Sequence, residues 1–206
     1  MKGVLMRYGK IAFLFVLVLV VSAGFALAEM EIKTPDLPAA ELAKVDSGEI
    51  YFRSEAKKDA EGKVSGGGLA VGYFKAPKDK IIDTILKYED YPQFMPQVSE
   101  TEVNHSGNEH NVKFTIKVFL FTIRYYMTHT VDREAGTVRF TLDKSKENDI
   151  VGTDGYWALK PYKEGFLVYY YADVDTGLKV PSKVQEFLTK RSLPKVVKAM
   201  KKRVGG

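Results

Sequence analysis

The spacing of apolar side chains along the chain changes from strand-like to helical near residue 176. Between residues 98 and 175, apolar and polar positions alternate in short segments, and turn sequences that contain glycine or asparagine separate these segments. Alternation with a period of two is typical of strands that bury one face. The pattern predicts an antiparallel meander with strands at 98–105, 110–118, 122–132, 137–143, 152–161 and 165–175.

The segment 180–204 has helical spacing, with lysines and arginines opposite an apolar stripe. The first half of the stripe consists of Val180, Val184, Phe187 and Leu188. It resumes beyond Pro194, which predicts a long amphipathic helix with a kink at the proline. We interpret the kink as curvature along the sheet, with a hinge that admits cargo as the alternative. One long helix that closes an antiparallel sheet has to lie across the concave face of the sheet, where a cavity can form.

The N-terminal half contains shorter elements. Strands are expected at 49–57 and 69–75, joined as a hairpin through a turn at 59–62 and a flexible glycine stretch at 65–68. Residues 39–45 could form one or two helical turns, and the isoleucines at 81, 82 and 85 predict a helix over 77–87. A loop with prolines at positions 92 and 96 follows this helix and interrupts it.

The first 28 residues have the composition of a secretory signal peptide. Basic residues precede the apolar run 11–21, and Ala26-Leu27-Ala28 supplies a cleavage pattern. An uncleaved membrane anchor is the alternative. We therefore expect a signal peptide at 1–28, a tether at 29–47 and a ligand-binding domain at 48–204. Cleavage near Ala28 would place the mature chain in the periplasm or outside the cell.

The charge and composition of the chain argue against nucleic-acid binding and exclude cysteine chemistry. The full chain has a net charge of +5, but three basic residues and no acidic residue lie in the predicted signal, which leaves +2. A nearly neutral, exported chain is a poor candidate for binding nucleic acid. The chain has no cysteine, which excludes disulfides and thiolate chemistry.

Candidate catalytic and metal-binding residues do not form a recognisable motif. His105 and His110 flank a turn. His129 lies in mid-strand without a carboxylate or second histidine at metal-ligand spacing, and a cross-strand polar pair is its favoured interpretation. Asp173 and Asp175 share one face of a strand and could act as an acid/base dyad, although a solvated strand end explains them more simply. We expect no catalytic site, no metal and no cofactor.

The order of these elements, together with three segments, carries a family resemblance. The segments are the helix and Tyr-Pro-x-Phe-x-Pro loop at 71–98, the hairpin at 155–177 and the terminal helix at 180–204. Over 48–204 the chain resembles the START-like helix-grip superfamily, and within it the polyketide cyclase and coenzyme Q-binding branch. The resemblance implies an α+β fold, with a curved antiparallel sheet wrapped around a long C-terminal helix and an apolar tunnel between them. It also implies a lipid, quinone, sterol or polyketide ligand and, in most members, no cofactor.

We expect a set of apolar and aromatic residues to line this cavity, although sequence alone does not decide which face of the last strand points inward. The candidates are Phe94, Met95, Tyr125, Tyr156, Tyr169, Tyr171, Leu178, Val184, Phe187 and Leu188. Phe94 and Met95 would lie at the mouth, on a loop that could act as a gate. The basic face of the terminal helix is either a solvated surface or a docking surface for anionic lipid headgroups.

The sequence thus predicts an exported protein that binds or transports a hydrophobic ligand such as a lipid or quinone. Transient contact with a membrane surface would occur through the basic terminal helix. A cyclase or hydrolase that uses the same cavity is one alternative. An interaction module with a filled core is the other.

Overall fold

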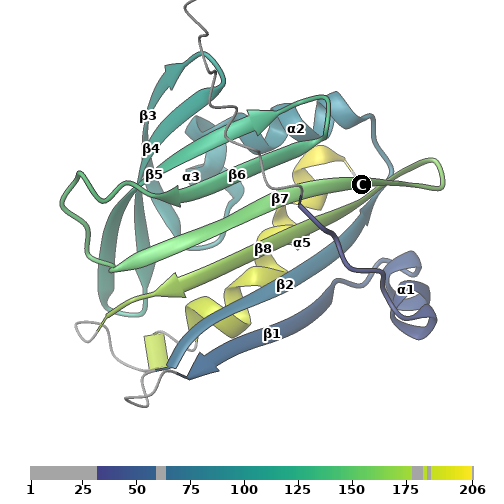
Figure 1. Cartoon of the computed structure of the whole chain (residues 1–206), viewed down its shortest axis with the longest axis horizontal. Coiled ribbons are helices and arrows are strands. Elements are labelled where there is room, and N and C mark those ends of the chain that lie inside the picture. The colour runs from purple at the N-terminus through teal and green to yellow at the C-terminus, as the bar shows by residue number, and fades with distance from the viewer. Residues whose placement is uncertain (1–31, 59–63, 178–182, 185–186, 206) are drawn as a thin grey trace, which may run out of the picture. The chain divides into compact units, whose positions relative to one another are not determined.

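Eight antiparallel strands form one sheet in the computed structural model, which describes residues 32–58, 64–177, 183–184 and 187–205 (Figure 1). The spatial order is β1-β2-β8-β7-β6-β5-β4-β3, so the N-terminal hairpin pairs with the last strand of the meander. The strands are β1 (Tyr51–Lys58), β2 (Val64–Phe74), β3 (Val98–Ser106), β4 (Glu109–Val118), β5 (Phe121–Asp132), β6 (Thr137–Leu142), β7 (Gly152–Tyr162) and β8 (Gly165–Asp175). The predicted meander is therefore confirmed.

Helices cover both faces of this sheet. The inner face, defined here as the face that meets α5 (Ser192–Val204), is also covered by α2 (Lys78–Leu86), η1 (Tyr88–Asp90) and α3 (Tyr91–Phe94). The opposite, outer face packs against α1 (Ala39–Asp46). Figure 1 shows α5 running across the sheet on the side away from α1. This arrangement confirms the predicted α+β helix-grip fold.

Small residues on the inner face of β2 let α5 approach the sheet closely. Gly68 and Gly72 point toward α5, and a Cβ atom at Gly72 would lie 3.1 Å from Cγ1 of Val197. The glycine stretch 66–68 is therefore part of a strand that is paired on both sides, and the expectation of a flexible connection is wrong. Glycine is needed there because the helix occupies the space that a side chain would fill.

The segment 32–46 also differs from the expectation of a tether. Ile32, Leu37 and Leu42 pack on the outer face of β2, β7 and β8, and Val45 of α1 is completely buried there. Lys160 of β7 donates a 2.6 Å hydrogen bond to the carboxylate of Asp36. This segment is an integral layer of the fold, because its apolar residues cover outward-facing side chains of the sheet.

The terminal helix is interrupted before its proline. A π-helical turn, η2 (Phe187–Arg191), leads directly into α5, and Pro194 occupies the third position of α5. Proline has no N–H to donate to the preceding turn and its ring crowds that turn, so the chain departs from regular α-helical bonding just before it. The sequence predicts a kink at Pro194. In the structure the irregularity lies just before the proline, in the π-helical turn η2.

The predicted signal peptide at 1–28 lies outside the described residues. Within the described ranges, no helix combines the length and hydropathy required to span a membrane.

Candidate functional site

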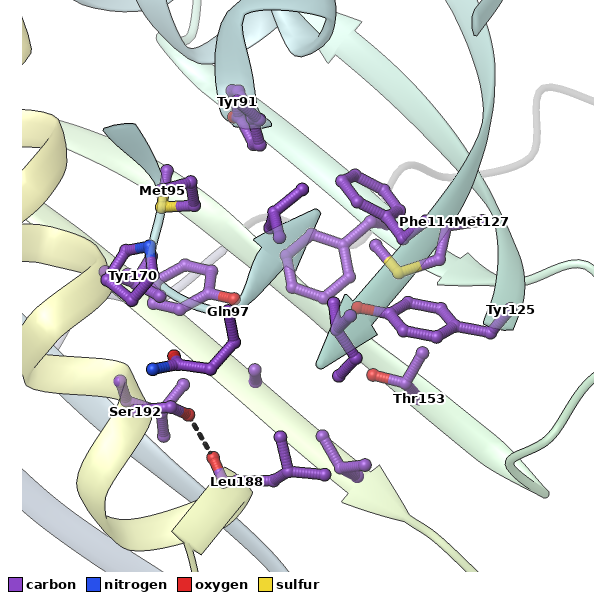
Figure 2. A pocket seen from close by; sticks show the side chains of 18 of the residues that line it. Tyr91, Met95, Gln97, Phe114, Tyr125, Met127, Thr153, Tyr170, Leu188 and Ser192 are labelled. Carbon is purple, nitrogen blue, oxygen red and sulfur yellow. Dashed lines mark hydrogen bonds between the residues drawn. The ribbon is translucent and has the colours of Figure 1, made fainter. Parts of the chain in front are cut away.

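A cavity of about 140 Å³ lies between the inner face of the sheet, α5 and the segment that joins α3 to β3 (Figure 2). Its volume is similar to that of cavities in protein cores that admit a benzene ring. The described residues that line it are Tyr88, Tyr91, Met95, Pro96, Gln97, Val98, Phe114, Ile116, Tyr125, Met127, His129, Phe140, Ile150, Thr153, Trp157, Tyr170, Ala172, Val174, Leu188, Ser192, Leu193 and Val196.

Alternation along the central strands supplies most of this lining. Every second residue of β4, β5, β7 and β8 points inward, and aromatic rings from neighbouring strands pack together. Trp157 stacks on Tyr170 with ring centroids 4.2 Å apart, and Phe114 stacks on Tyr125 at 5.6 Å. Figure 2 shows the hydroxyl oxygens of Tyr125 and Tyr170 directed into the cavity. These contacts give it a rigid aromatic wall.

The segment between α2 and β3 closes the cavity on the side opposite the sheet. The Tyr91 hydroxyl donates a 2.6 Å hydrogen bond to the carbonyl oxygen of Ile85, near the C-terminal end of α2. Gln97 has a positive φ of 63°, and its carbonyl oxygen accepts a hydrogen bond from the N–H of Lys117. Its side chain extends into the cavity (Figure 2). A left-handed backbone at a residue other than glycine is strained, and it holds this amide in the binding space.

Two polar atoms of the lining are buried without a hydrogen-bond partner among the described residues. They are the hydroxyl oxygen of Tyr88, a side chain that is 1 % exposed, and Nδ1 of His129, which is 3 % exposed. The two rings are in contact, with centroids 4.7 Å apart. Three hydroxyl groups of the lining are paired within the protein. Tyr91 is bonded to Ile85, the hydroxyl of Thr153 donates to the carbonyl of Asp173, and that of Ser192 donates to the carbonyl of Leu188.

The three histidines of the chain form one row across the sheet. His105 pairs with His110 in the register of β3 and β4, and His110 pairs with His129 in the register of β4 and β5. Nδ1 of His105 lies 2.5 Å from Nδ1 of His110, and Nε2 of His105 lies 3.0 Å from the carboxylate of Glu89. The row therefore runs from solvent to the cavity wall. Burial lowers the pKa of His129 to about 3, so this imidazole is neutral at physiological pH.

The cavity holds no charged side chain among its described lining residues. Burial raises the pKa of the lining phenols Tyr125 and Tyr170, which keeps them protonated. An ionised group inside would therefore lack a counter-charge, and its desolvation would be costly. No cluster of histidine and acidic residues in the described ranges is arranged to hold a metal ion. The site fits an uncharged, largely apolar molecule.

Some predicted cavity residues line the cavity and others lie on the wrong face of the sheet. Met95, Tyr125 and Leu188 line it, and their contact with a ligand stays a prediction. Tyr156, Tyr169 and Tyr171 lie on the outer face, in the cluster that packs against α1. The expectation for these three tyrosines is corrected by the alternation of β7 and β8, which turns Trp157 and Tyr170 inward instead.

The remaining candidates lie beside the cavity. The ring of Phe94 faces a surface groove, where the guanidinium of Arg203 lies 5.3 Å from its centroid. Phe187 packs edge-on against Phe119 with centroids 5.5 Å apart, and Val184 is buried in the core. Leu178 lies outside the described residues. The candidate dyad of Asp173 and Asp175 does not contribute to the lining, and the Asp175 carboxylate accepts a hydrogen bond from the N–H of Gly177.

Solved structures with the same architecture settle the fold. A STAR-related lipid transfer protein from Xanthomonas axonopodis superposes with a TM-score of 0.60, at 19% identity over 74% of this chain and 99% of that chain. The chain has the START-like helix-grip fold. An aromatase/cyclase from a Streptomyces species gives a TM-score of 0.57 at 12% identity, over 75% of this chain and 94% of that one.

A START superfamily protein from Mycobacterium smegmatis also superposes on this chain, with a TM-score of 0.57. Its sequence is 16% identical over 67% of this chain and 96% of its own length. No protein-family model matches the sequence, and no curated protein matches it. Proteins with this START-like fold thus include both a lipid transfer protein and a cyclase, so the fold alone does not choose between transport and catalysis.

Proposed function

We propose that this protein is an exported carrier that binds a hydrophobic ligand in the cavity between the sheet and α5. The observation that carries the proposal is the cavity itself, which is enclosed by aromatic and aliphatic side chains and has only a few polar groups. Apolar surface removed from water stabilises a complex by roughly 25 cal/mol per Å². A few fixed polar groups then orient the bound molecule.

The chemistry of the lining favours a carrier over an enzyme. Among the described lining residues, His129 is the one side chain that titrates near neutral pH in water, and burial lowers its pKa to about 3. A base this weak removes protons inefficiently at neutral pH. Structural similarity to both a lipid transfer protein and an aromatase/cyclase supports a hydrophobic ligand in either case.

An exposed apolar surface beside the cavity supports delivery at a membrane. The connection between β4 and β5 carries Phe119 and Leu120, which are 70% and 98% exposed. Phe119 packs on Phe187, and the ammonium of Lys195 lies 5.2 Å from the Phe187 ring centroid. We call Phe119, Leu120, Phe121 and Phe187 the hairpin surface. Leu188, the neighbour of Phe187, lines the cavity, so the hairpin surface adjoins the binding space.

The charge around the hairpin surface is suited to an anionic bilayer. Lys117 and Arg124 lie on the strands that flank it, and Lys195 and Lys198 lie on α5; all four are exposed. Cations at a lipid surface each contribute about 1 kcal/mol to binding. An apolar tip with a cationic rim combines the two attractions that interfacial proteins use. The proposed contact therefore involves the hairpin surface as well as the basic face of α5.

The decisive experiment is native mass spectrometry of the exported chain, purified without detergent and followed by solvent extraction. A defined co-purifying hydrophobic molecule, released on denaturation, supports the carrier proposal. A ligand-free mass that does not change after incubation with a membrane lipid extract would contradict it. Conversion of an added ligand to a product of different mass would instead establish an enzyme.

A further inference from the structure

Two residues that line the cavity each carry a buried, unpaired polar atom that the proposed function does not use. Tyr88 and His129 are both more than nine-tenths buried, both line the cavity, and each has one side-chain polar atom without a partner in the described structure. Buried polar atoms of native proteins are nearly always hydrogen-bonded, so two such atoms on contacting rings of a cavity wall are available to a polar group placed in the cavity.

The position of Tyr88 and His129 is fixed by the surrounding structure. The carbonyl of Tyr88 accepts a 2.9 Å hydrogen bond from the hydroxyl of Thr101, and the Tyr88 ring packs against Tyr91 and Phe114. The His129 ring packs against Phe114 and Phe140. Neither ring can turn away to reach water without breaking these contacts. The two polar atoms are therefore held in place before a ligand arrives.

We propose that Tyr88 and His129 form a recognition site for an uncharged hydroxyl group on the hydrophobic ligand. A hydroxyl both donates and accepts, so it can pair with the Tyr88 hydroxyl and with either tautomer of His129. Water can occupy the same place in the free protein, and a ligand hydroxyl that replaces it preserves both hydrogen bonds, whereas a hydrocarbon loses them. The proposal deepens the proposed function and rests on it.

The cavity lining also discriminates against ionised groups. No lysine, arginine or acidic side chain lies among the described lining residues. Glu89, the sequence neighbour of Tyr88, contacts His105 at the surface. A carboxylate or phosphate in contact with Tyr88 and His129 would be desolvated without a counter-charge. The ligand class is therefore an alcohol or phenol with an apolar body.

Three matched probes test this proposal by isothermal titration calorimetry on the mature chain: 4-propylphenol, propylbenzene and 4-propylbenzoate. We expect 4-propylphenol to bind about tenfold more tightly than propylbenzene, since two neutral hydrogen bonds are gained. The ionised benzoate should bind on the order of 100-fold more weakly than the phenol. Trp157, the single tryptophan of the chain, lines the cavity and provides an independent fluorescence signal.

Substitutions in the cavity lining test whether Tyr88 and His129 form the recognition site. Tyr88→Phe should remove part of the preference for 4-propylphenol over propylbenzene, and Tyr88→Phe with His129→Phe should remove nearly all of this preference. Tyr91→Phe is the matched control, because that hydroxyl is already bonded to Ile85. Tyr125→Phe is a second control, because its hydroxyl also points into the cavity (Figure 2).

The possible negative results distinguish failure of the hydroxyl-recognition proposal from failure of the proposed carrier function. Equal affinity for phenol and propylbenzene would refute hydroxyl recognition and leave the apolar cavity intact. A preference that survives in the double variant, or that Tyr125→Phe abolishes, would refute the assignment to Tyr88 and His129. Tight binding of 4-propylbenzoate would refute the uncharged ligand class. Binding of none of the three probes would contradict the proposed function itself.

Discussion

Leu193 of α5 packs directly onto Gly68 of β2. A Cβ atom at position 68 would lie 3.0 Å from Cδ1 of Leu193 and 2.7 Å from Cε2 of Phe52. One turn further along α5, Val197 makes the equivalent contact with Gly72. The helix thus lies on a strip of glycine and alanine residues of β2, and this close approach sets the width of the cavity beside it.

Substitution of this glycine tests how tightly α5 is seated. We expect Gly68→Ala to lower the free energy of unfolding by about 1–3 kcal/mol, because the added methyl group overpacks the contacts with Phe52 of β1 and Leu193 of α5. Urea denaturation followed by Trp157 fluorescence measures the change. Gly152→Ala is the control: its Cβ would meet only the Asp175 Cβ, at 3.7 Å, and we expect a change within about 0.5 kcal/mol. Equal effects of both substitutions would contradict close packing of α5 and Phe52 around Gly68.

The alternation of apolar residues was sufficient to predict the strands, but it could not decide which face of β8 points inward. Both faces of the strand carry large apolar residues: Tyr170 faces the cavity and Tyr169 faces α1. When a sheet is covered on both sides, alternation no longer distinguishes core from solvent. Residues 32–46, which lie within the segment that the sequence predicts to be a tether, supply the second cover.

A signal for the inward face was nevertheless present in β2. Gly68, Ala70 and Gly72 alternate with larger residues, and a strip of such small residues marks the face on which another backbone element packs. Pairing of β2 with β8 places Ala70 opposite Tyr170, on this same face. The unpaired atoms of Tyr88 and His129 carried no such signal, because they are brought together by three-dimensional packing of η1 on β5.

Because His129 is buried as a neutral imidazole, the fold should lose stability in acid. The pKa of His129 is about 3 in the folded state, against about 6.5 in an unfolded chain. Between these values the unfolded state binds more protons, so stability is complete above pH 6.5 and falls as the pH decreases below it. From pH 7 to pH 5 this group should lower the free energy of unfolding by about 2 kcal/mol.

Comparison of the wild-type chain with His129→Phe isolates this contribution. Phenylalanine preserves the ring contacts with Tyr88 and Phe140, and the variant should lose less stability than wild type between pH 7 and pH 5. His110 faces His129 from β4, and its pKa is also lowered by burial, but it is present in both proteins and cancels in the difference. Identical pH profiles would show that His129 is not the titrating group.

Filling the cavity should weaken ligand binding without lowering the stability of the fold. Ala172 of β8 lines the cavity, and Ala172→Leu adds three carbon atoms there. We expect the affinity for 4-propylphenol to fall by at least about tenfold, while the thermal midpoint stays constant or rises, because a filled void gains packing contacts. Ala43→Leu on the exposed side of α1 is the control and should leave affinity unchanged. Unchanged affinity in Ala172→Leu would place the ligand elsewhere.

The hairpin surface should govern attachment to membranes. Leu120 is 98% exposed and would enter the bilayer, so Leu120→Glu should weaken binding to phosphatidylglycerol-containing vesicles by about tenfold or more. Lys195→Glu should weaken it in low salt only, because screening suppresses the charge contribution while the apolar contribution persists. Lys80→Glu, on α2 near the C-terminal end of α5, carries the same charge change away from the hairpin surface and serves as the control. Vesicle co-sedimentation measures all three variants. Equal losses in Lys80→Glu and Lys195→Glu would mean that net charge, and not the hairpin surface, directs the protein to the membrane.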